Sequence, residues 1–578
     1  MKVLLAAVNA KYIHSNLAVY DLKAYVKNLP VSVEIAEYTI NQQLEEILRD
    51  IYEKRTDIVG FSCYIWNISY VRTLIRELHK LSPDTRIWLG GPEASYDAKR
   101  LMSELPAVEL IMLGEGEETF AKLLKKCLTG DKNLSDISGI CYRQKEELLL
   151  ENPPGSYLDM DKIPFVYEDI EKFKNKILYY ETSRGCPFRC SYCLSSIDKR
   201  VRLRSLSVVF PELQFFLDHR VAQVKFVDRT FNCNHEHAYA IWKYLYEHDN
   251  GITNFHFEVA ADLLCDEDMV LFSKMRKGLI QLEIGVQSTN PDTIAQIHRK
   301  MDLEKVVKYV ACVKKMGNIH QHLDLIAGLP CEGFERFGQS FNDVYKMRPD
   351  QLQLGFLKVL KGSYLEEHKE EYQLITISDP PYEVLSTKWL SYEERSQLKD
   401  VEEMVEVYYN SGRFDTSLQY LIPFFESPFL FYLDFSVYYR RQGWMGLKHT
   451  RLFRYDALRK YVKSTGRMDE VSLLRLDEYL IHDLYLTENC KKRPEWAWDE
   501  SNARKMLKKI RDPKWRREYM EPEESAAIEK ILQNRTDLHM EQYCNTREGR
   551  YLLYDYHNRD VLTNRADIFE FQQRNVIV

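Results

Sequence analysis

Two series of short apolar runs, each run followed by a helical pattern, fill the first 360 residues and limit the folds open to this chain. Short apolar runs that alternate with helices are typical of a parallel sheet with helices on both faces. Five such βα units predict a flavodoxin-like, doubly wound α/β domain of the Rossmann type. Its expected strands are Lys2–Val8, Val31–Thr39, Asp57–Ile65, Arg86–Gly90 and Leu110–Leu113.

The second series begins after a break. A predicted hairpin, Ser138–Leu150, leads to Asn152–Gly155, where two prolines and a glycine indicate a linker. Six further βα units predict a partial barrel, with its chemistry at the carboxyl ends of the strands. The expected strands are Leu178–Thr182, Gln223–Val227, Asn254–Ala260, Leu279–Val286, His320–Ile326 and Gln351–Val359.

From about residue 391 glycine becomes sparse and helical periodicity dominates, for example in Ser396–Asn410, Met468–Leu486 and Glu521–Gln533. This change in composition and periodicity predicts a mostly helical C-terminal domain. We therefore expect four parts: the doubly wound domain 1–135, the hairpin and linker 136–177, the partial barrel 178–390 and the helical domain 391–578.

Composition excludes several classes of protein. The chain has 578 residues, 45% hydrophobic and 29% charged, with a net charge of −7, which is ordinary for a globular protein and gives no general attraction to nucleic acid or anionic lipid. The apolar run at the N-terminus is too short for a signal peptide. The most apolar later stretch, Tyr420–Tyr439, contains Glu426 and Asp434, so it does not read as a membrane span. We expect a cytoplasmic protein with neither a nucleic-acid nor a membrane partner.

Three of the twelve cysteines are grouped as Cys186-x3-Cys190-x2-Cys193, directly after the first predicted barrel strand. Thiolates are ligands for iron-sulfur clusters or zinc. Structural zinc takes four ligands, usually as two spaced pairs, whereas this loop offers three. Three cysteines on a cubane would leave one iron open for a small molecule, so the spacing favours a 4Fe-4S cluster.

The run from Tyr180 to Cys193, with the aromatic Tyr192 just before the third cysteine, resembles the signature of the radical S-adenosylmethionine (SAM) superfamily. The resemblance implies that SAM chelates the open iron. It also implies that the reduced cluster cleaves SAM to a 5′-deoxyadenosyl radical, which abstracts a hydrogen from the substrate. An electron donor such as flavodoxin or ferredoxin is then a required partner.

Later strand ends resemble other motifs of that superfamily, in Phe226–Phe231, Glu283–Ser288 and Leu325–Pro330. Cys331 stands where such motifs usually carry glycine, which makes it a candidate active-site thiol; the alternative is an ordinary loop residue. The resemblance implies SAM contacts at Tyr192, Asp228, Glu258, Gln287 and Ser288.

The first domain is similar to the cobalamin-binding domain of one class of that superfamily. Its loop Asn9–Leu17 lacks the Asp and Gly of the usual Asp-x-His-x-x-Gly pattern. We therefore expect cobalt without a histidine ligand, and His14 either lies beside the corrin or is a hydrogen-bonded loop residue. The implied cobalamin contacts are Tyr12, His14, Ser62, Tyr64, Gly90, Gly91, Glu115 and Gly116.

A cobalamin-dependent radical SAM enzyme of this kind implies a methyltransferase that methylates an unactivated carbon of a small molecule or peptide. Two alternatives stay open: a rearrangement or cyclisation without methyl transfer, and a cofactor-binding sensor with a structural cluster. Glu426 and Asp434 are further candidates, if Tyr420–Tyr439 covers the active site. The alternative for that segment is a core helix with two charges at its exposed edge.

Overall fold

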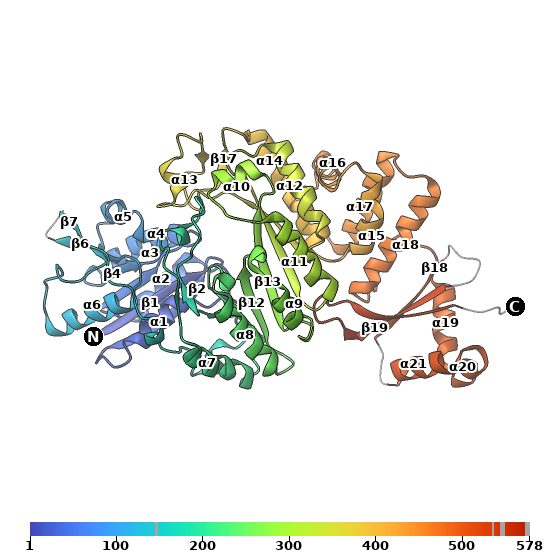
Figure 1. Ribbon diagram of the computed structural model, residues 1–578, viewed down its shortest axis with the longest axis horizontal. Coiled ribbons are helices and arrows are strands. Elements are labelled where there is room, and N and C mark those ends of the chain that lie inside the picture. The colour runs from blue at the N-terminus through green and yellow to red at the C-terminus, as the bar shows by residue number, and fades with distance from the viewer. Residues whose placement is uncertain (145–147, 534–536, 544–549, 573–578) are drawn as a thin grey trace. The chain divides into compact units, whose positions relative to one another are not determined.

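The computed structural model describes residues 1–144, 148–533, 537–543 and 550–572 (Figure 1). The chain divides into two compact units. The first comprises residues 1–319, 326–333 and 355–392, and the second comprises residues 320–325, 334–354 and 393–578. The loop that carries Cys186, Cys190 and Cys193 and the first domain both belong to the first unit.

The first domain has the predicted doubly wound sheet. Its parallel strands run in the order β2-β1-β3-β4-β5, which is the flavodoxin-like arrangement. The strand interiors are apolar because both faces are covered. The strands are β1 (Lys2–Asn9), β2 (Ser32–Thr39), β3 (Ile58–Ser62), β4 (Arg86–Gly90) and β5 (Val108–Met112).

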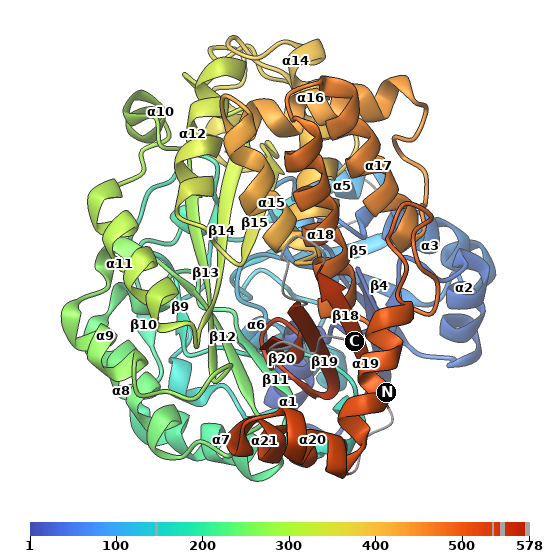
Figure 2. The same cartoon turned by 90° about the vertical axis from the view of Figure 1, so that its right-hand side faces the viewer.

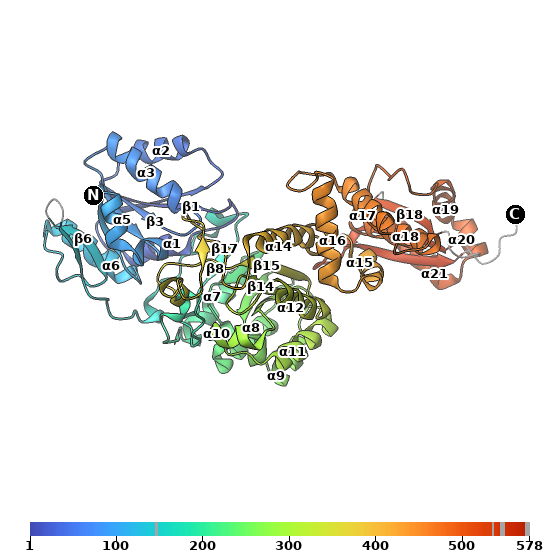
Figure 3. The same cartoon turned by 90° about the horizontal axis from the view of Figure 1, so that it is seen from above.

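Helices form a separate core on each face of this sheet (Figure 3). The helices α2 (Leu44–Glu53), α3 (Ile68–Leu81) and α5 (Ala98–Glu104) cover one face. The helices α1 (Leu17–Tyr25) and α6 (Glu117–Thr129) cover the other.

The helical segment after β4 is interrupted. The structure has a short helix α4 (Pro92–Ser95) before α5, and Tyr96–Asp97 separate the two. Asp97 has φ −142°, outside the helical region, so the chain turns there and starts a new helix.

The predicted hairpin is present, but it belongs to the first sheet. Strands β6 (Ile140–Gln144) and β7 (Leu148–Glu151) add to β5 in antiparallel fashion. Residues 145–147 of the hairpin lie outside the described residues. The linker therefore begins after β7.

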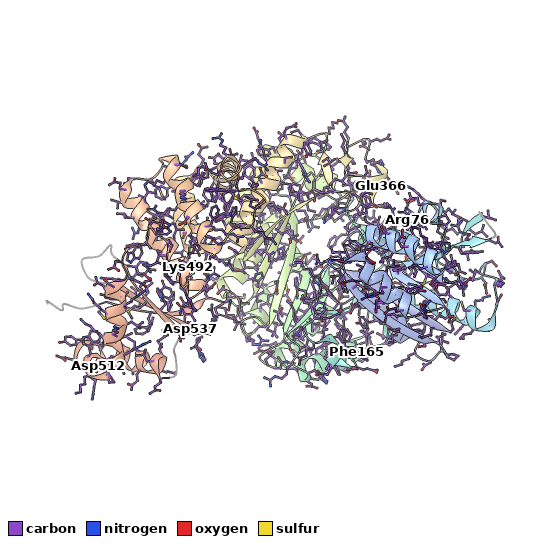
Figure 4. All side chains as sticks on the ribbon, turned by 180° about the vertical axis from the view of Figure 1, so that it is seen from behind. Arg76, Phe165, Glu366, Lys492, Asp512 and Asp537 are labelled. Atoms are coloured by element: carbon purple, nitrogen blue, oxygen red, sulfur yellow. The ribbon has the colours of Figure 1, made fainter. Side chains whose placement is uncertain are left out.

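The linker packs on the first helix of the barrel, α7 (Leu206–Asp218). Phe165, labelled in Figure 4, contacts the rings of Phe215 and Phe216, with centroids 5.1 and 5.4 Å apart. These aromatic contacts fix the linker against the barrel.

The barrel sheet has six strands in the order β15-β14-β13-β12-β11-β8, as six βα units predict. The strands are β8 (Leu178–Tyr180), β11 (Gln223–Phe226), β12 (Asn254–Val259), β13 (Ile280–Gln287), β14 (His320–Ala327) and β15 (Gln351–Phe356). The helices between and after them are α7, α8 (His235–Glu247), α9 (Asp266–Phe272), α10 (Pro291–Gln296), α11 (Leu303–Met316) and α12 (Phe334–Lys346). An aromatic core of Phe226, Phe231, Trp242, Phe257 and Phe272 holds α8 and α9 on the sheet.

The C-terminal part of the second unit is mostly helical, as predicted, but it ends in an unpredicted antiparallel sheet (Figure 2). The sheet consists of β18 (Leu538–Tyr543), β19 (Arg550–Arg559) and β20 (Ala566–Gln572). Within the described ranges, no helix is both long and apolar enough to cross a membrane. The main helices are α14 (Tyr392–Met404), α15 (Asp415–Leu421), α16 (Pro428–Arg441), α17 (Arg451–Thr465), α18 (Glu470–Thr487), α19 (Ser501–Arg511), α20 (Pro513–Tyr519) and α21 (Pro522–Leu532).

The aromatic face of α16 supplies a stability prediction. Phe431 is fully buried against Phe425, Tyr432, Phe435 and Tyr461. Phe431→Ala should therefore lower the free energy of unfolding of this unit by about 3–5 kcal/mol, because it leaves a cavity.

Denaturant unfolding of the full chain measures this loss. The neighbouring Leu430 is 36% exposed, and Leu430→Ala should change the same free energy by at most about 0.5 kcal/mol. Equal effects of the two substitutions would contradict the packing described for α16.

Candidate active site

The three cysteines lie on the loop that follows β8. Cys186 and Cys190 are 8% and 7% exposed, and Cys193 is half-buried. The loop turns at Gly185, whose φ is +91° and where a Cβ would lie 2.2 Å from the Arg200 carbonyl oxygen. Only glycine fits so close an approach at a positive φ. The chain thus gathers three thiols on one tightly folded loop.

Asp228, at the end of β11, fastens the start of this loop. Its carboxylate accepts hydrogen bonds from the Thr182 amide (3.0 Å), the Thr182 hydroxyl (2.6 Å) and the Ser183 hydroxyl (2.6 Å). Burial raises the pKa of Asp228, and these donors oppose that rise. The carboxylate that we predicted as a SAM contact therefore positions the loop; its contact with SAM stays a prediction.

Tyr192 and Arg299 lie beside the second cysteine. The Arg299 guanidinium donates to the Tyr192 hydroxyl (3.3 Å) and lies 3.7 Å from the Cys190 sulfur. It also donates to the Gly285 carbonyl oxygen at 2.5 Å, at the end of β13. Burial raises the pKa of the Cys190 thiol, and the Arg299 guanidinium opposes that rise.

The other predicted SAM residues lie at the ends of β12 and β13. Glu258 is half-buried, 3.9 Å from the Lys225 ammonium. Ser288 is buried and donates to Glu332 at 2.7 Å. Gln287 has φ +70°, and its Oε1 is buried with no hydrogen-bond partner among the described residues. Such an acceptor points to a ligand, since a buried polar atom without a partner is costly.

Cys331 follows β14 with φ +64° and is half-buried. Its carbonyl oxygen accepts a hydrogen bond from Asn290 at 2.9 Å. Positive φ is the geometry that the glycine of related motifs adopts freely. Cys331 is thus a strained loop residue near Ser288 and Glu332, and its role as an active-site thiol stays a prediction.

In the first domain, the predicted cobalamin residues share the carboxyl edge of the sheet. Ser62 accepts a hydrogen bond from Asn16 at 3.0 Å, and the ring of Tyr64 stacks on Trp66 at 4.3 Å. Gly91 has φ +100°, and a Cβ there would lie 2.5 Å from the Cys63 carbonyl oxygen. Gly90 precedes it at the end of β4.

His14 and Tyr12 lie on the first loop of the same edge. The His14 Nδ1 is 2.6 Å from the hydroxyl of Tyr179, which belongs to β8. Burial lowers the pKa of His14, and Lys11 and Lys225 lower it further. His14 is therefore hydrogen-bonded in this loop, and its place beside the corrin stays a prediction, as does the role of Tyr12, which is 71% exposed.

The loop after β5 is tied to the cluster loop by ion pairs. Arg184 donates to Glu117 at 2.6 Å and to Glu181 at 2.9 Å. Glu115 pairs with Arg202, and it also accepts from the Leu158 amide at 3.0 Å. Burial raises the pKa of Glu115, but Arg202 and the amide outweigh it, so the net shift is downward. Gly116 lies between the two glutamates.

Sequence reasoning missed the residues that make these ties, Arg184, Arg202 and Arg299. Arg184 and Arg202 lie in the two-residue strands β9 (Ser183–Arg184) and β10 (Arg202–Leu203), and no sequence spacing distinguishes any of the three from a solvated charge. Arg184 follows Ser183 within the cysteine-bearing run, so its place near the first cysteine was the one available signal.

Glu426 and Asp434 belong to the second unit, and both are exposed. The buried aromatic residues of α16 face α12 and α17, through contacts such as Tyr432 with Phe341 and Phe435 with Tyr461. Partial burial and the nearby Glu426 raise the pKa of Asp434. This is the arrangement of a core helix with charges at its exposed edge; the covering role of Tyr420–Tyr439 stays a prediction.

Family models match three parts of the chain. The B12 binding domain matches residues 3–124, the radical SAM superfamily matches residues 180–344, and a family described as protein of unknown function (DUF4080) matches residues 370–550. The first two matches fall on the doubly wound domain and on the barrel.

Several curated relatives share these parts. An uncharacterized methyltransferase of Pyrococcus horikoshii is 24% identical over 332 residues, 56% of this chain and 71% of that protein. The cobalamin-dependent radical SAM methyltransferase TokK of Streptomyces tokunonensis is 24% identical over 354 residues, 56% of this chain and 50% of that protein. The anaerobic magnesium-protoporphyrin IX monomethyl ester cyclase of Rubrivivax gelatinosus is 22% identical over 324 residues, 53% of this chain and 57% of that protein. The chain thus spans about half the length of the last two.

Two solved structures share the fold. The cobalamin-dependent SAM radical enzyme OxsB, with aqua-cobalamin bound, has a TM-score of 0.58 at 17% identity, covering 84% of this chain and 80% of that one. The radical SAM methyltransferase TsrM of Kitasatospora setae, with cobalamin and a [4Fe-4S] cluster bound, has a TM-score of 0.55 at 16% identity. The match covers 65% of this chain and 76% of that one.

The cysteine loop generates a direct test. After anaerobic reconstitution, the wild-type chain should hold about four irons, as a cubane requires. Replacing Cys186, Cys190 and Cys193 together with Ala should remove the iron, because no other three cysteines stand so close together in the sequence.

Iron content and the visible absorption of the reconstituted chain measure this. Cys312→Ala is the matched control, because Cys312 is a half-buried cysteine on α11, away from the loop. A triple variant that still binds a full cubane would disprove the assignment.

Proposed function

Because the chain belongs to the B12-binding radical SAM enzymes, we propose that it transfers a methyl group to an unactivated carbon of a small molecule or peptide. Its cofactors are a 4Fe-4S cluster, SAM and cobalamin. When bound, the cluster with SAM supplies a hydrogen-abstracting radical, and cobalamin carries the methyl group. A small one-electron donor such as flavodoxin or ferredoxin would reduce the cluster.

The residues of this chain suit these groups. Cys186, Cys190 and Cys193 would hold the cluster, and the unpartnered Oε1 of Gln287 offers an acceptor at a strand end close to it. In the first domain, Gly114 has no side chain, and the space beside its Cα is open: a Cβ built there would meet nothing within 4 Å. Such an open backbone at the end of β5 lets a large ring approach.

One observation carries the proposal: the carboxyl edges of the two sheets meet. Arg184, two residues before Cys186, is paired with Glu117 of the loop after β5. Tyr179 of β8 contacts His14 of the loop after β1. Parallel sheets bind ligands at these edges, so one substrate could reach both ligand sites.

The protein's own part in the reaction is positioning and exclusion of water. Asp228 holds the start of the cysteine loop, and Arg299 links Tyr192 to the end of β13. The two most buried thiols are almost closed to solvent. A radical reaction requires such shielding, because stray hydrogen donors would quench it.

Cyclisation without methyl transfer is the second candidate, favoured by the similarity to the Rubrivivax gelatinosus cyclase. The two reactions differ in what happens to SAM. Methyl transfer at an unactivated carbon should consume about two SAM per product, giving S-adenosylhomocysteine and 5′-deoxyadenosine in equal amounts.

Quantifying both SAM products, under reducing conditions and with candidate substrates, tests the proposal. 5′-Deoxyadenosine without S-adenosylhomocysteine would favour cyclisation or rearrangement. A chain that binds the cluster but forms neither product, with a competent reductant, would be a sensor. The background level of both SAM products is measured with the cluster-free variant, in which Cys186, Cys190 and Cys193 are all replaced by Ala.

His14 provides a test of the cobalamin site. Because the loop Asn9–Leu17 lacks the Asp and Gly of the usual Asp-x-His-x-x-Gly pattern, bound cobalamin should be in the base-off form without a histidine on cobalt. His14→Ala should leave the spectrum of bound Co(II) cobalamin nearly unchanged. A nitrogen splitting in the electron paramagnetic resonance spectrum that His14→Ala removes would contradict this.

A further inference from the structure

Four potential metal ligands converge on the outer part of the barrel, at the loops that follow β11 and β12. The Nε2 of His235 lies 3.3 Å from the Cys265 sulfur and 3.1 Å from Asp268 Oδ1. Glu267 completes the group: one atom each of His235, Cys265 and Glu267 lie within 4.8 Å of one another. This group is distinct from the three cysteines of the cluster loop.

The separations suit one small ion. Two ligands on tetrahedral zinc, with bonds of about 2.0 Å to nitrogen and 2.3 Å to sulfur, are about 3.5 Å apart. The imidazole nitrogen and the thiol sulfur have nearly that separation. Imidazole, thiolate and carboxylate together are also the ligand types that zinc takes in proteins.

Charge in the group is unbalanced. Asp268 is fully buried, and its Oδ1 faces His235, while Oδ2 accepts from the Cys265 amide at 2.9 Å. Glu267 lies near Tyr239: partial burial raises the pKa of the Tyr239 phenol, and the Glu267 carboxylate raises it further. Within the described part of the chain, neither Asp268 nor Glu267 has a lysine or arginine ion pair. A buried carboxylate without a full counter-charge is costly, and a divalent cation would remove that cost.

We propose that His235, Cys265 and Glu267 bind a zinc ion, with Asp268 as the fourth ligand. The site is structural, and it does not depend on the proposed function. Asn232 already joins the same two loops, by donating to the Ala260 carbonyl oxygen and accepting from the Ala260 amide, both at 2.9 Å.

The ion fastens the loop after β11 to the loop after β12. The first of these loops starts with Asp228, which holds the cluster loop, and the second follows Glu258. Zinc would thus stiffen two strand ends that face the cofactors, without touching them.

The experiment uses the full-length chain with Cys186, Cys190 and Cys193 replaced by Ala, so that neither iron nor cluster thiols interfere. The chain is stripped with a chelator and titrated with Co²⁺, a spectroscopic probe for zinc sites. Roughly one Co²⁺ per chain should bind, with a thiolate-to-cobalt charge-transfer band and the visible bands of tetrahedral cobalt, and Zn²⁺ should displace it.

Cys265→Ser should abolish the charge-transfer band, and His235→Ala should abolish specific binding. Glu267→Gln, at an exposed position that leaves the fold intact, should weaken binding. Cys312→Ser is the matched control and should change nothing. In addition, Zn²⁺ should raise the midpoint of thermal unfolding of the parent chain but not of Cys265→Ser.

The proposal fails if Cys265→Ser keeps the charge-transfer band, or if the parent chain shows no tetrahedral cobalt. The four side chains would then be a hydrogen-bonded group that joins two helices. Zinc content of the cluster-loaded wild-type chain, compared with that of its Cys265→Ser and Glu267→Gln variants, covers the case in which the triple variant does not fold. Equal zinc in all three would also overturn it.

Discussion

The buried carboxylate of Asp228 and its three hydrogen bonds to Thr182 and Ser183 are the contact on which the site depends. They fix the chain immediately before Gly185, where it must turn with a positive φ. That turn brings the backbone at Gly185 against the Arg200 carbonyl oxygen and leads directly into the three cysteines. Parallel strands bring Asp228 to this loop, because β11 and β8 are neighbours and their ends lie side by side.

The same stretch of chain joins the two cofactor domains. Arg184 stands between the residues held by Asp228 and the turn at Gly185, and its guanidinium extends to Glu117 and Glu181. Each of these groups is largely buried, so the pairs are screened much less than surface pairs. A rearrangement of the loop after β5 would therefore displace Arg184 and, with it, the start of the cysteine loop.

Much of this could be predicted from sequence. The alternation of apolar runs and helices predicted both sheets, and the cysteine spacing singled out the loop after β8, whose role in holding a cluster stays a prediction. Both signals are local. What was missed depends on contacts between distant residues: no sequence pattern marks the ion pair of Arg184 with Glu117, or the hydrogen bonds that Asp228 accepts from Thr182. The final sheet was missed because β18–β20 follow a long helical stretch, and their alternation is weak, as in Arg550–Arg559, where six consecutive residues are buried.

The burial of the cysteine loop limits how the protein can acquire its cluster. Two of its thiols are 8% and 7% exposed in the folded chain, so an iron donor could hardly reach them. Cluster insertion therefore needs a loop that is open, either during synthesis or through local unfolding. The ion pairs of Arg184 oppose such opening once the first domain has docked. We therefore expect iron and sulfide to enter fastest before the two domains close, and more slowly in the folded chain.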